Sequence, residues 1–203
     1  EPLENIVNRF IKRIFDIGFS ILVTVLLLSW FIPLMAIIIK ISSKGPIFFI
    51  QKRSGIKNKS FDVIKFRTMY LNTDAHYKQA TRDDDRITPI GKFLRKTNLD
   101  ELPQFINVLL GQMSVIGPRP HMLKHTEEYS KIIDKFMVRH LVKPGITGWA
   151  QVNGYRGETK DVNDMEGRVR ADVWYIENWS FGLDVKIIVM TIINMIRGEE
   201  NAF

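Results

Sequence analysis

The stretch IGFSILVTVLLLSWFIPLMAIII, residues 17–39, contains no charged residue and decides the fold. A helix needs about 20 consecutive apolar residues to cross a bilayer, so this segment predicts a membrane helix. Pro33 lies inside the run, where its missing N–H and its ring kink a helix. Residues 1–16 carry acids as well as bases, and no small-residue cleavage site follows the apolar run. The segment is therefore atypical of a signal peptide.

Basic residues flank this segment on both sides. They are Arg9, Lys12 and Arg13 before it, and Lys40, Lys44, Lys52, Arg53, Lys57, Lys59, Lys65 and Arg67 after it, against one acid, Asp62. Basic residues gather on the cytoplasmic side of membrane segments, so a single crossing is expected to have one basic side. A broken helix that enters and leaves by the same face agrees with both flanks and with Pro33. A kinked single span is the alternative, and the pattern leaves both open.

The bulk composition narrows the classes of partner. The 203 residues include 29 Lys and Arg against 22 Asp and Glu, a formal charge of +7, which suits an anionic partner. The sequence contains no cysteine, which excludes a disulfide framework, a thiolate metal site and a cysteine nucleophile. The basic residues do not form a recognition-helix pattern, so no nucleic acid is expected. We also find no P-loop, GxGxxG or GxSxG motif.

Hydrophobic periodicity predicts a mixed order of elements. Residues 5–16 predict a basic amphipathic helix suited to a membrane surface. Two β-rich runs, 47–52 and 61–69, are joined by SGIKNKS and predict a hairpin. Helices are predicted over 72–79, 90–96, 100–110, 122–142, 164–178 and 183–196, and the glycine-dense stretch 143–157 predicts loops with one short strand.

LDELPQF, residues 99–105, places two carboxylates just before a helical pattern. Proline is tolerated in the first turn of a helix, so Pro103 places the helix start near Asp100. An aspartate at that position caps free backbone N–H groups. The same position favours phosphate, where an ionised aspartate is a plausible nucleophile and Glu101 a ligand for Mg²⁺. The local sequence leaves the cap and the catalytic pair open as alternatives.

Basic residues on stiff turns suit phosphate oxygens, which arginine binds with two parallel hydrogen bonds. The candidates are Lys65, Arg67, Arg95, Arg119, Lys143 and Arg156. A solvated basic surface is the alternative for each of them. His121 and His125 are four residues apart but have no third ligand nearby, so they do not predict a zinc site. The acidic run 83–85 predicts a loop tip.

Three stretches together carry a family resemblance: KFRTM at 65–69, RITPIGKFLRKTNLDELPQFINVLLGQMSVIGPRP at 86–120, and KPGITGWAQVNGYRG at 143–157. The chain resembles the bacterial sugar transferases of the monotopic phosphoglycosyl transferase superfamily, also called polyprenyl-phosphate hexose-1-phosphate transferases. The resemblance runs from about Asn8 to Gly198. The residues before the membrane segment look like the junction of the longer members, so we expect the catalytic region of a longer protein.

The resemblance implies a reaction. Members transfer a sugar 1-phosphate from a nucleoside diphosphate sugar, often a UDP-sugar, to polyprenyl (undecaprenyl) phosphate and release UMP. This is the first membrane step of exopolysaccharide, capsule or O-antigen synthesis. The family's aspartate attacks the β-phosphate in a ping-pong mechanism through a covalent phosphosugar, and its glutamate helps to hold Mg²⁺. These roles fall on Asp100 and Glu101.

The resemblance also assigns residues, partners and a fold class. Arg95 is the further catalytic candidate, and the substrate-binding candidates are Lys65, Arg67, Pro118, Arg119, Gln151 and Arg156. The implied fold class is α+β. Residues 1–41 are expected to form an amphipathic and re-entrant membrane helix. Residues 42–203 are expected to form a mainly helical cytosolic catalytic domain with a small β-hairpin and interfacial helices. The implied location is the bacterial inner membrane, with the domain facing the cytoplasm.

Several points stay open on the sequence alone. The expected partners are a UDP-sugar, polyprenyl phosphate and membrane lipids, and a homodimer is left open. The sequence contains no motif that distinguishes glucose, galactose or N-acetylated hexoses. A membrane-anchored scaffold that binds a nucleotide or a partner without catalysis is the alternative function.

Overall fold

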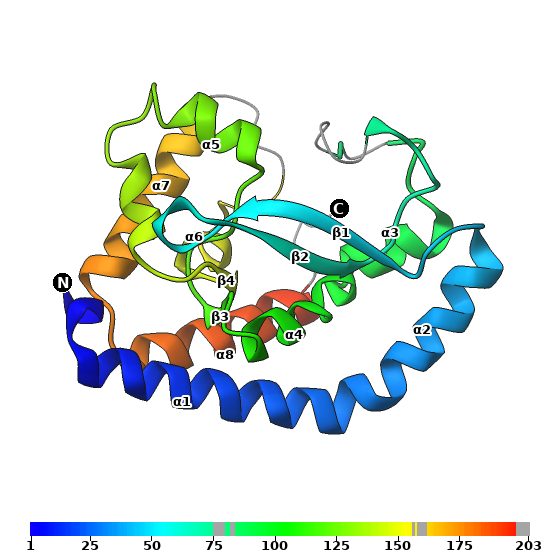
Figure 1. Cartoon of the computed structure of the whole chain (residues 1–203), viewed down its shortest axis with the longest axis horizontal. Coiled ribbons are helices and arrows are strands. Elements are labelled where there is room, and N and C mark those ends of the chain that lie inside the picture. Colours follow the sequence, from blue (N-terminus) through cyan, green and yellow to red (C-terminus); the bar gives the residue numbers. More distant parts are fainter. Residues whose placement is uncertain (75–79, 82–83, 156, 158–161, 198–203) are drawn as a thin grey trace.

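The N-terminal region forms one long bent helix. The computed structural model describes residues 1–74, 80–81, 84–155, 157 and 162–197. After a 3₁₀ turn, η1 (Pro2–Glu4), helix α1 (Ile6–Val23) continues through a π-helical turn, η2 (Thr24–Leu28), into α2 (Ser29–Ser42). Figure 1 shows α1 along the base of the molecule and α2 rising from its far end. Of the described residues, Ile6–Ser42 is the one helix long and apolar enough to cross a bilayer.

The bend between α1 and α2 has a local cause. Pro33 cannot donate to the carbonyl of Ser29, and π-helical turns and prolines are the usual sites of helix kinks. Side chains occupy carbonyls at the bend: the Ser29 hydroxyl donates to Val25 O over 2.7 Å, and Trp30 Nε1 donates to Leu26 O over 3.0 Å. The helix therefore turns just before Pro33. That both ends lie on one side of a membrane stays a prediction.

Helix α1 is amphipathic as predicted, but its polar side faces the protein. Lys12, Asp16 and Ser20 are buried, whereas Ile6, Phe10 and Ile14 are 79%, 64% and 56% exposed. In a water-soluble protein the apolar stripe of such a helix faces the core. The inverted arrangement indicates that the outer face of α1 meets a membrane.

Two small sheets form the centre of the domain. The predicted hairpin is present: β1 (Phe48–Ser54) pairs antiparallel with β2 (Ser60–Phe66), with Phe48 opposite Phe66. A 3₁₀ turn, η3 (Ile56–Asn58), joins the two strands. The predicted short strand is β4 (Gly145–Thr147), which pairs in parallel with β3 (Ser114–Ile116).

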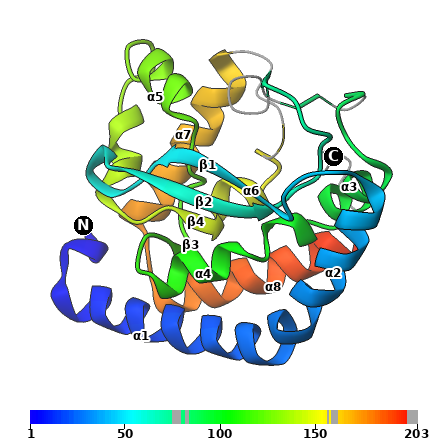
Figure 2. The same ribbon diagram turned by 45° about the vertical axis from the view of Figure 1, so that its right-hand side comes forward.

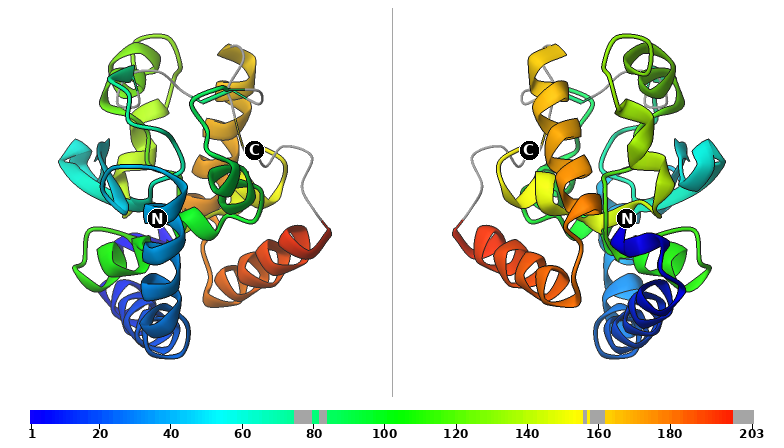
Figure 3. Two further views of the ribbon diagram at one scale, coloured as in Figure 1. Left: turned by 90° about the vertical axis from the view of Figure 1, so that its right-hand side faces the viewer. Right: turned by 90° about the vertical axis from the view of Figure 1, so that its left-hand side faces the viewer.

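The remaining elements surround these sheets. They are α3 (Pro89–Lys96), η5 (Leu99–Glu101), α4 (Gln104–Leu109), α5 (Leu123–Tyr129), η6 (Phe136–Leu141), α6 (Trp149–Val152), α7 (Val162–Glu177) and α8 (Phe181–Arg197). The predicted helices 90–96, 164–178 and 183–196 correspond to α3, α7 and α8. Figures 2 and 3 show α1 and α8 at the base of the domain, with α5 and the start of α7 on the opposite side. The predicted helix 72–79 falls largely on residues outside the described part.

Two of the predicted helices are not continuous in the structure, so these predictions were wrong. The predicted helix 122–142 is broken, because Lys135 adopts a left-handed conformation (φ 60°) and η6 follows as a 3₁₀ helix. This break lets both Phe136 and Arg139 point inward, at 1% and 4% exposure. The predicted helix 100–110 is divided into η5 and α4, because Pro103 has no N–H and the turns around it use hydrogen bonds to the third residue before.

A buried cluster under the hairpin connects the membrane helix to the domain. It contains Met35 and Ile39 of α2, Phe66 of β2 and Leu94 of α3. Phe66 and Leu94 are at most 1% exposed. This packing fixes the end of β2 and the end of α3 relative to α2. The segment that follows α3, which holds the two adjacent carboxylates, is thereby placed beside the hairpin.

Candidate active site

Asp100 and Glu101 lie in the tight connection between α3 and α4. Asn98 precedes them in a left-handed conformation with φ 59°, which asparagine tolerates better than most residues. This reverses the chain and turns both carboxylates inward. Their exposed fractions are 8% for Asp100 and 6% for Glu101. Carboxylates are seldom buried to this extent unless cations face them.

Glu101 is held by two cations from distant parts of the chain. Lys65 Nζ, near the end of β2, donates to Glu101 Oε1 over 2.7 Å. Arg119 Nη2 donates to the same oxygen over 2.6 Å, and Arg119 Nη1 donates to Oε2 over 3.1 Å. This is the two-point geometry in which a guanidinium binds a carboxylate most strongly. The structure thus brings together the first two of the three family stretches, 65–69 and 86–120, at Glu101.

Asp100 has a different environment from its neighbour. Burial raises the pKa of its carboxyl, and the charge of Glu101 raises it further, while Lys65, Arg95 and Arg119 act in the opposite direction. Neither η5 nor α4 begins with a side-chain cap hydrogen bond. Asp100 therefore does not act as the helix cap that its position suggested. It is a buried carboxylate surrounded by cations. These cations would reduce the repulsion between the carboxylate and a phosphate.

Arg95 and Arg67 take separate places. Arg95 Nε donates to Thr68 Oγ1 over 2.8 Å, and its charge acts on Asp100, so it belongs to the surroundings of the dyad. Arg67 instead donates to the carbonyls of Ser43 (2.8 Å) and Lys44, where α2 ends. The structure therefore brings Arg95 to the dyad and leaves Arg67 at the end of the membrane helix. Its role in substrate binding stays a prediction.

The glycine-rich stretch packs against the loop that carries Arg119. Gly145 N donates to Pro118 O over 2.9 Å, and a Cβ on Gly145 would lie 2.1 Å from Gly117 N. Only glycine permits this approach. Gln151 is 3% exposed, and its Nε2 donates to Ile146 O over 3.1 Å. Gln151 therefore supports the loop from within, and Arg156 lies outside the described residues.

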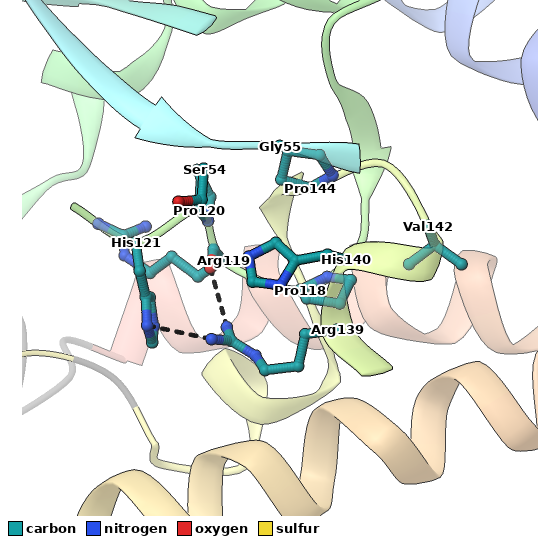
Figure 4. A pocket seen from close by; sticks show the side chains of 10 residues that line it. All are labelled: Ser54, Gly55, Pro118, Arg119, Pro120, His121, Arg139, His140, Val142 and Pro144. Atoms are coloured by element: carbon teal, nitrogen blue, oxygen red, sulfur yellow. Dashed lines mark hydrogen bonds between the residues drawn. The ribbon is translucent and has the colours of Figure 1, made fainter. Parts of the chain in front are cut away.

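A basic pocket that the sequence did not predict adjoins Arg119. Figure 4 shows the pocket between the loop at Pro118–His121 and the segment at Arg139–Pro144. Arg139 Nη1 contacts His121 Nδ1 over 3.0 Å, and Arg139 Nη2 donates to Arg119 O over 2.9 Å. Arg139 also forms a buried ion pair with Asp172 of α7, 2.7 Å long. The sequence around Arg139 resembles a solvated helix face, so no local signal identified Arg139 as a site residue.

The donor set at the dyad fits a hard divalent cation. No group of three or more His, Asp or Glu side chains placed to hold a metal occurs in the described ranges. Mg²⁺, however, is commonly held by one or two carboxylates while substrate phosphates and waters complete its shell. Adjacent Asp100 and Glu101 supply that number. His121 and His125 belong to no such group within the described part.

Comparison with known proteins identifies relatives over nearly the whole chain. The model of the family described as "Bacterial sugar transferase" matches residues 7–198. A UDP-glucose:undecaprenyl-phosphate glucose-1-phosphate transferase of Escherichia coli (strain K12) is 50% identical over 187 residues, which cover 92% of this chain and 40% of the relative. The chain thus spans well under half the length of that relative.

Two further relatives show the range of donors that the names record. A Caulobacter vibrioides protein with the same name as the Escherichia coli relative is 41% identical over 206 residues, covering 100% of this chain and 75% of the relative. An Aeromonas hydrophila protein named UDP-N-acetylgalactosamine-undecaprenyl-phosphate N-acetylgalactosaminephosphotransferase is 43% identical over 196 residues, covering 95% of this chain and 45% of the relative.

Proposed function

Because the chain belongs to the bacterial sugar transferase family, we propose that it transfers a sugar 1-phosphate from a UDP-sugar to undecaprenyl phosphate and releases UMP. The observation that carries the proposal is the buried pair Asp100–Glu101 with Lys65 and Arg119 bound to Glu101. Names of relatives that are 41–50% identical support the same chemistry.

In the first half-reaction an Asp100 oxygen attacks the β-phosphorus, which bears the sugar. The bond between this phosphorus and the oxygen that bridges to the α-phosphate breaks, and UMP leaves with the electron pair. The product on the protein is an acyl phosphate that carries the sugar. Two anions must approach each other in this step, and Lys65, Arg95 and Arg119 reduce their repulsion.

In the second half-reaction a phosphate oxygen of the lipid attacks the same phosphorus. The bond to the Asp100 oxygen breaks, which restores the carboxylate and gives the lipid diphosphate sugar. The raised pKa of Asp100 favours the first half-reaction, because a more basic carboxylate is a better nucleophile. Because UMP leaves before the lipid acceptor binds, the mechanism is ping-pong.

Mg²⁺ is part of the proposal as a cofactor. Glu101, with Asp100 beside it, would hold it, and the ion would offset the negative charge of the diphosphate and stabilise the leaving phosphate. Lys65 and Arg119 orient the Glu101 carboxylate through the contacts described above. Their cationic groups also attract the diphosphate toward the dyad.

The proposed location follows from the outward apolar faces of α1 and α8. Val189, Ile192 and Ile196 of α8 are 49%, 51% and 80% exposed, like the outer residues of α1. We propose that both helices lie at the inner face of the bacterial cytoplasmic membrane, and that α1–α2 bends back to that face. This arrangement would keep Asp100 near the height of the lipid phosphate.

The test is transfer itself. The purified chain in lipid nanodiscs is incubated with Mg²⁺, undecaprenyl phosphate and UDP-glucose or UDP-N-acetylgalactosamine, and UMP and lipid-linked sugar are measured. We expect equal amounts of both products with one donor and none with Asp100→Asn. Asp62→Asn, an exposed carboxylate on β2, is the matched control and should retain activity. UMP without lipid product would indicate a hydrolase, and Mg²⁺-independent binding without UMP would indicate a scaffold.

A further inference from the structure

Guanidinium groups outnumber carboxylates in the region behind Arg119. The group, which we call the arginine cluster, consists of Arg53 on β1, Arg119 in its loop, Arg139 in η6 and Arg168 on α7. Three carboxylates act on it: Glu101 binds Arg119, Asp172 binds Arg139, and the charges of Asp172 and Asp164 act on Arg168. Within the described ranges, no carboxylate lies at ion-pair distance from Arg53 or Arg168. The cluster therefore has two guanidinium charges without a salt-bridge partner.

Burial makes the charged forms of Arg53 and Arg168 less favourable than in water. Arg168 is only 6% exposed, and its buried Nε has no acceptor. Burial and the charges of Arg119 and Arg139 lower its pKa to about 10. Burial and Arg119 also lower the pKa of Arg53 to about 10. Both groups therefore remain charged near neutral pH, although each repels its neighbours and has lost water.

His121 presents a further unmatched donor. Its side chain is in the pocket, and the residue is 5% exposed. A guanidinium only donates, so Arg139 Nη1 must donate to His121 Nδ1, which leaves the proton of the neutral ring on Nε2. That Nε2 is buried and has no hydrogen-bond acceptor. Burial and Arg139 hold the pKa of His121 well below its usual range, so the ring is neutral.

The cluster is connected directly to the dyad through one loop. Arg53 Nη1 donates to Pro120 O over 3.4 Å, and Arg139 Nη2 donates to Arg119 O over 2.9 Å. The side chain of Arg119, on the same loop, binds Glu101. Arg119 therefore joins the two places, because its backbone contacts the cluster and its side chain binds Glu101.

We propose that Arg53, Arg168 and the Nε2–H of His121 bind the phosphate that leaves with the nucleoside, next to the sugar-bearing phosphate at Asp100. The proposal rests on the proposed function and names its leaving-group subsite. Arg53 and Arg168 donate to Gln51 Oε1 and to Gly157 O but have no salt-bridge partner in the described part, so two guanidinium charges and a lone N–H donor together match the several oxygens of a phosphate. Such an anion would relieve both the repulsion and the missing hydrogen bonds.

The position of the cluster favours the nucleotide over the lipid phosphate. Figure 1 shows α5 and the first half of α7 on the side of the domain away from α1. The exposed apolar residues of α1 mark the membrane side. A water-soluble nucleotide reaches the opposite side freely, whereas a lipid phosphate is confined to the headgroup layer.

The experiment measures steady-state kinetics and UMP binding of the full chain in nanodiscs. Arg168→Gln and Arg53→Gln are compared with two exposed neighbours, Arg170→Gln on α7 and Lys52→Gln on β1. Loss of one hydrogen bond to a charged group corresponds to about a tenfold to hundredfold change. We expect the KM for the UDP-sugar and the inhibition constant of UMP to rise by that factor in both test variants, with the KM for undecaprenyl phosphate unchanged.

Further variants separate a lost fold from a lost subsite. Arg168→Lys keeps the charge and should recover part of the UMP affinity, and circular dichroism monitors folding of every variant. An unchanged UMP inhibition constant in folded Arg168→Gln and Arg53→Gln would overturn the proposal. A rise in the KM for undecaprenyl phosphate alone would also overturn it and assign the cluster to the lipid. Failure of the wild-type chain to release UMP would instead refute the proposed function.

Discussion

The docking of α1 onto the domain provides the sharpest stability prediction. Asp184 on α8 is completely buried and accepts three hydrogen bonds: from Lys12 Nζ over 2.6 Å, Tyr175 OH over 2.7 Å and Trp179 Nε1 over 3.0 Å. The Lys12 side chain is 10% exposed. This network is the polar link between α1, the end of α7 and α8.

Asp184→Asn keeps the shape but removes the charge, and its amide nitrogen cannot accept a hydrogen bond. Lys12 then remains buried without its counter-ion. Breaking one side of such a pair costs about 3–5 kcal/mol. For a chain of this size, each kcal/mol lowers Tm by about 2–4 °C, so we expect a fall of about 6–20 °C. The measurement is thermal unfolding followed by circular dichroism in detergent.

Two further variants test the reasoning. Asp62→Asn breaks the 3.5 Å pair with Lys52, whose side chains are 65% and 54% exposed, and should cost less than about 1 kcal/mol. The double variant Lys12→Met with Asp184→Leu should be more stable than Asp184→Asn, because it leaves no unpaired charge. If Asp184→Asn melts at the same temperature as Asp62→Asn, the buried link is not the anchor of α1.

Gly91→Ala puts a Cβ 2.0 Å from Thr68 O and should destabilise the fold by about 1–3 kcal/mol in chemical denaturation, whereas Gly182→Ala, with open space, should not. Arg95→Gln removes a charge that lowers the pKa of Asp100, so the low-pH limb of kcat/KM should move to higher pH; a shift to lower pH would contradict this assignment. Treatment with EDTA should abolish UMP release and added Mg²⁺ should restore it; activity that survives EDTA would exclude the cofactor.

Local sequence rules predicted the elements that rest on short-range physics. The periodicity of residues 90–96 predicted α3, and in the structure the Thr88 hydroxyl accepts from Gly91 N over 3.0 Å at the start of this helix. The alternation of 47–52 and 61–69 around a polar turn predicted the hairpin in the same way. These signals lie within a few residues of one another, so they are visible in the sequence.

Long-range contacts were not predictable by the same means. The amphipathic pattern of residues 5–16 predicted a helix at a membrane surface but gave no partner for its charged side, and the structure places Lys12 and Asp16 under the domain, where Asp16 accepts from Val115 N over 2.9 Å. Likewise, the left-handed Lys135 breaks a helix whose periodicity looks regular. Tertiary partners decide these cases, and no local pattern records them.

The candidate site was predictable in part. Asp100, Glu101, Lys65 and Arg119 were chosen from motifs, and the structure brings them together. The remaining members of the arginine cluster come from separate elements and resemble solvated surface charges in the sequence. Only the fold shows that Arg168 is buried without an ion-pair partner among the described residues.

The central claim is that Asp100 carries the phosphosugar between the two half-reactions. Its most direct test is intact-protein mass spectrometry after acid quenching of the chain with Mg²⁺ and a UDP-sugar, without undecaprenyl phosphate. We expect an added mass of one sugar phosphate on the peptide that contains Asp100, which disappears when undecaprenyl phosphate is supplied and never forms in Asp100→Asn. Turnover with a functional donor but without any such adduct, or an adduct on another residue, would contradict the account.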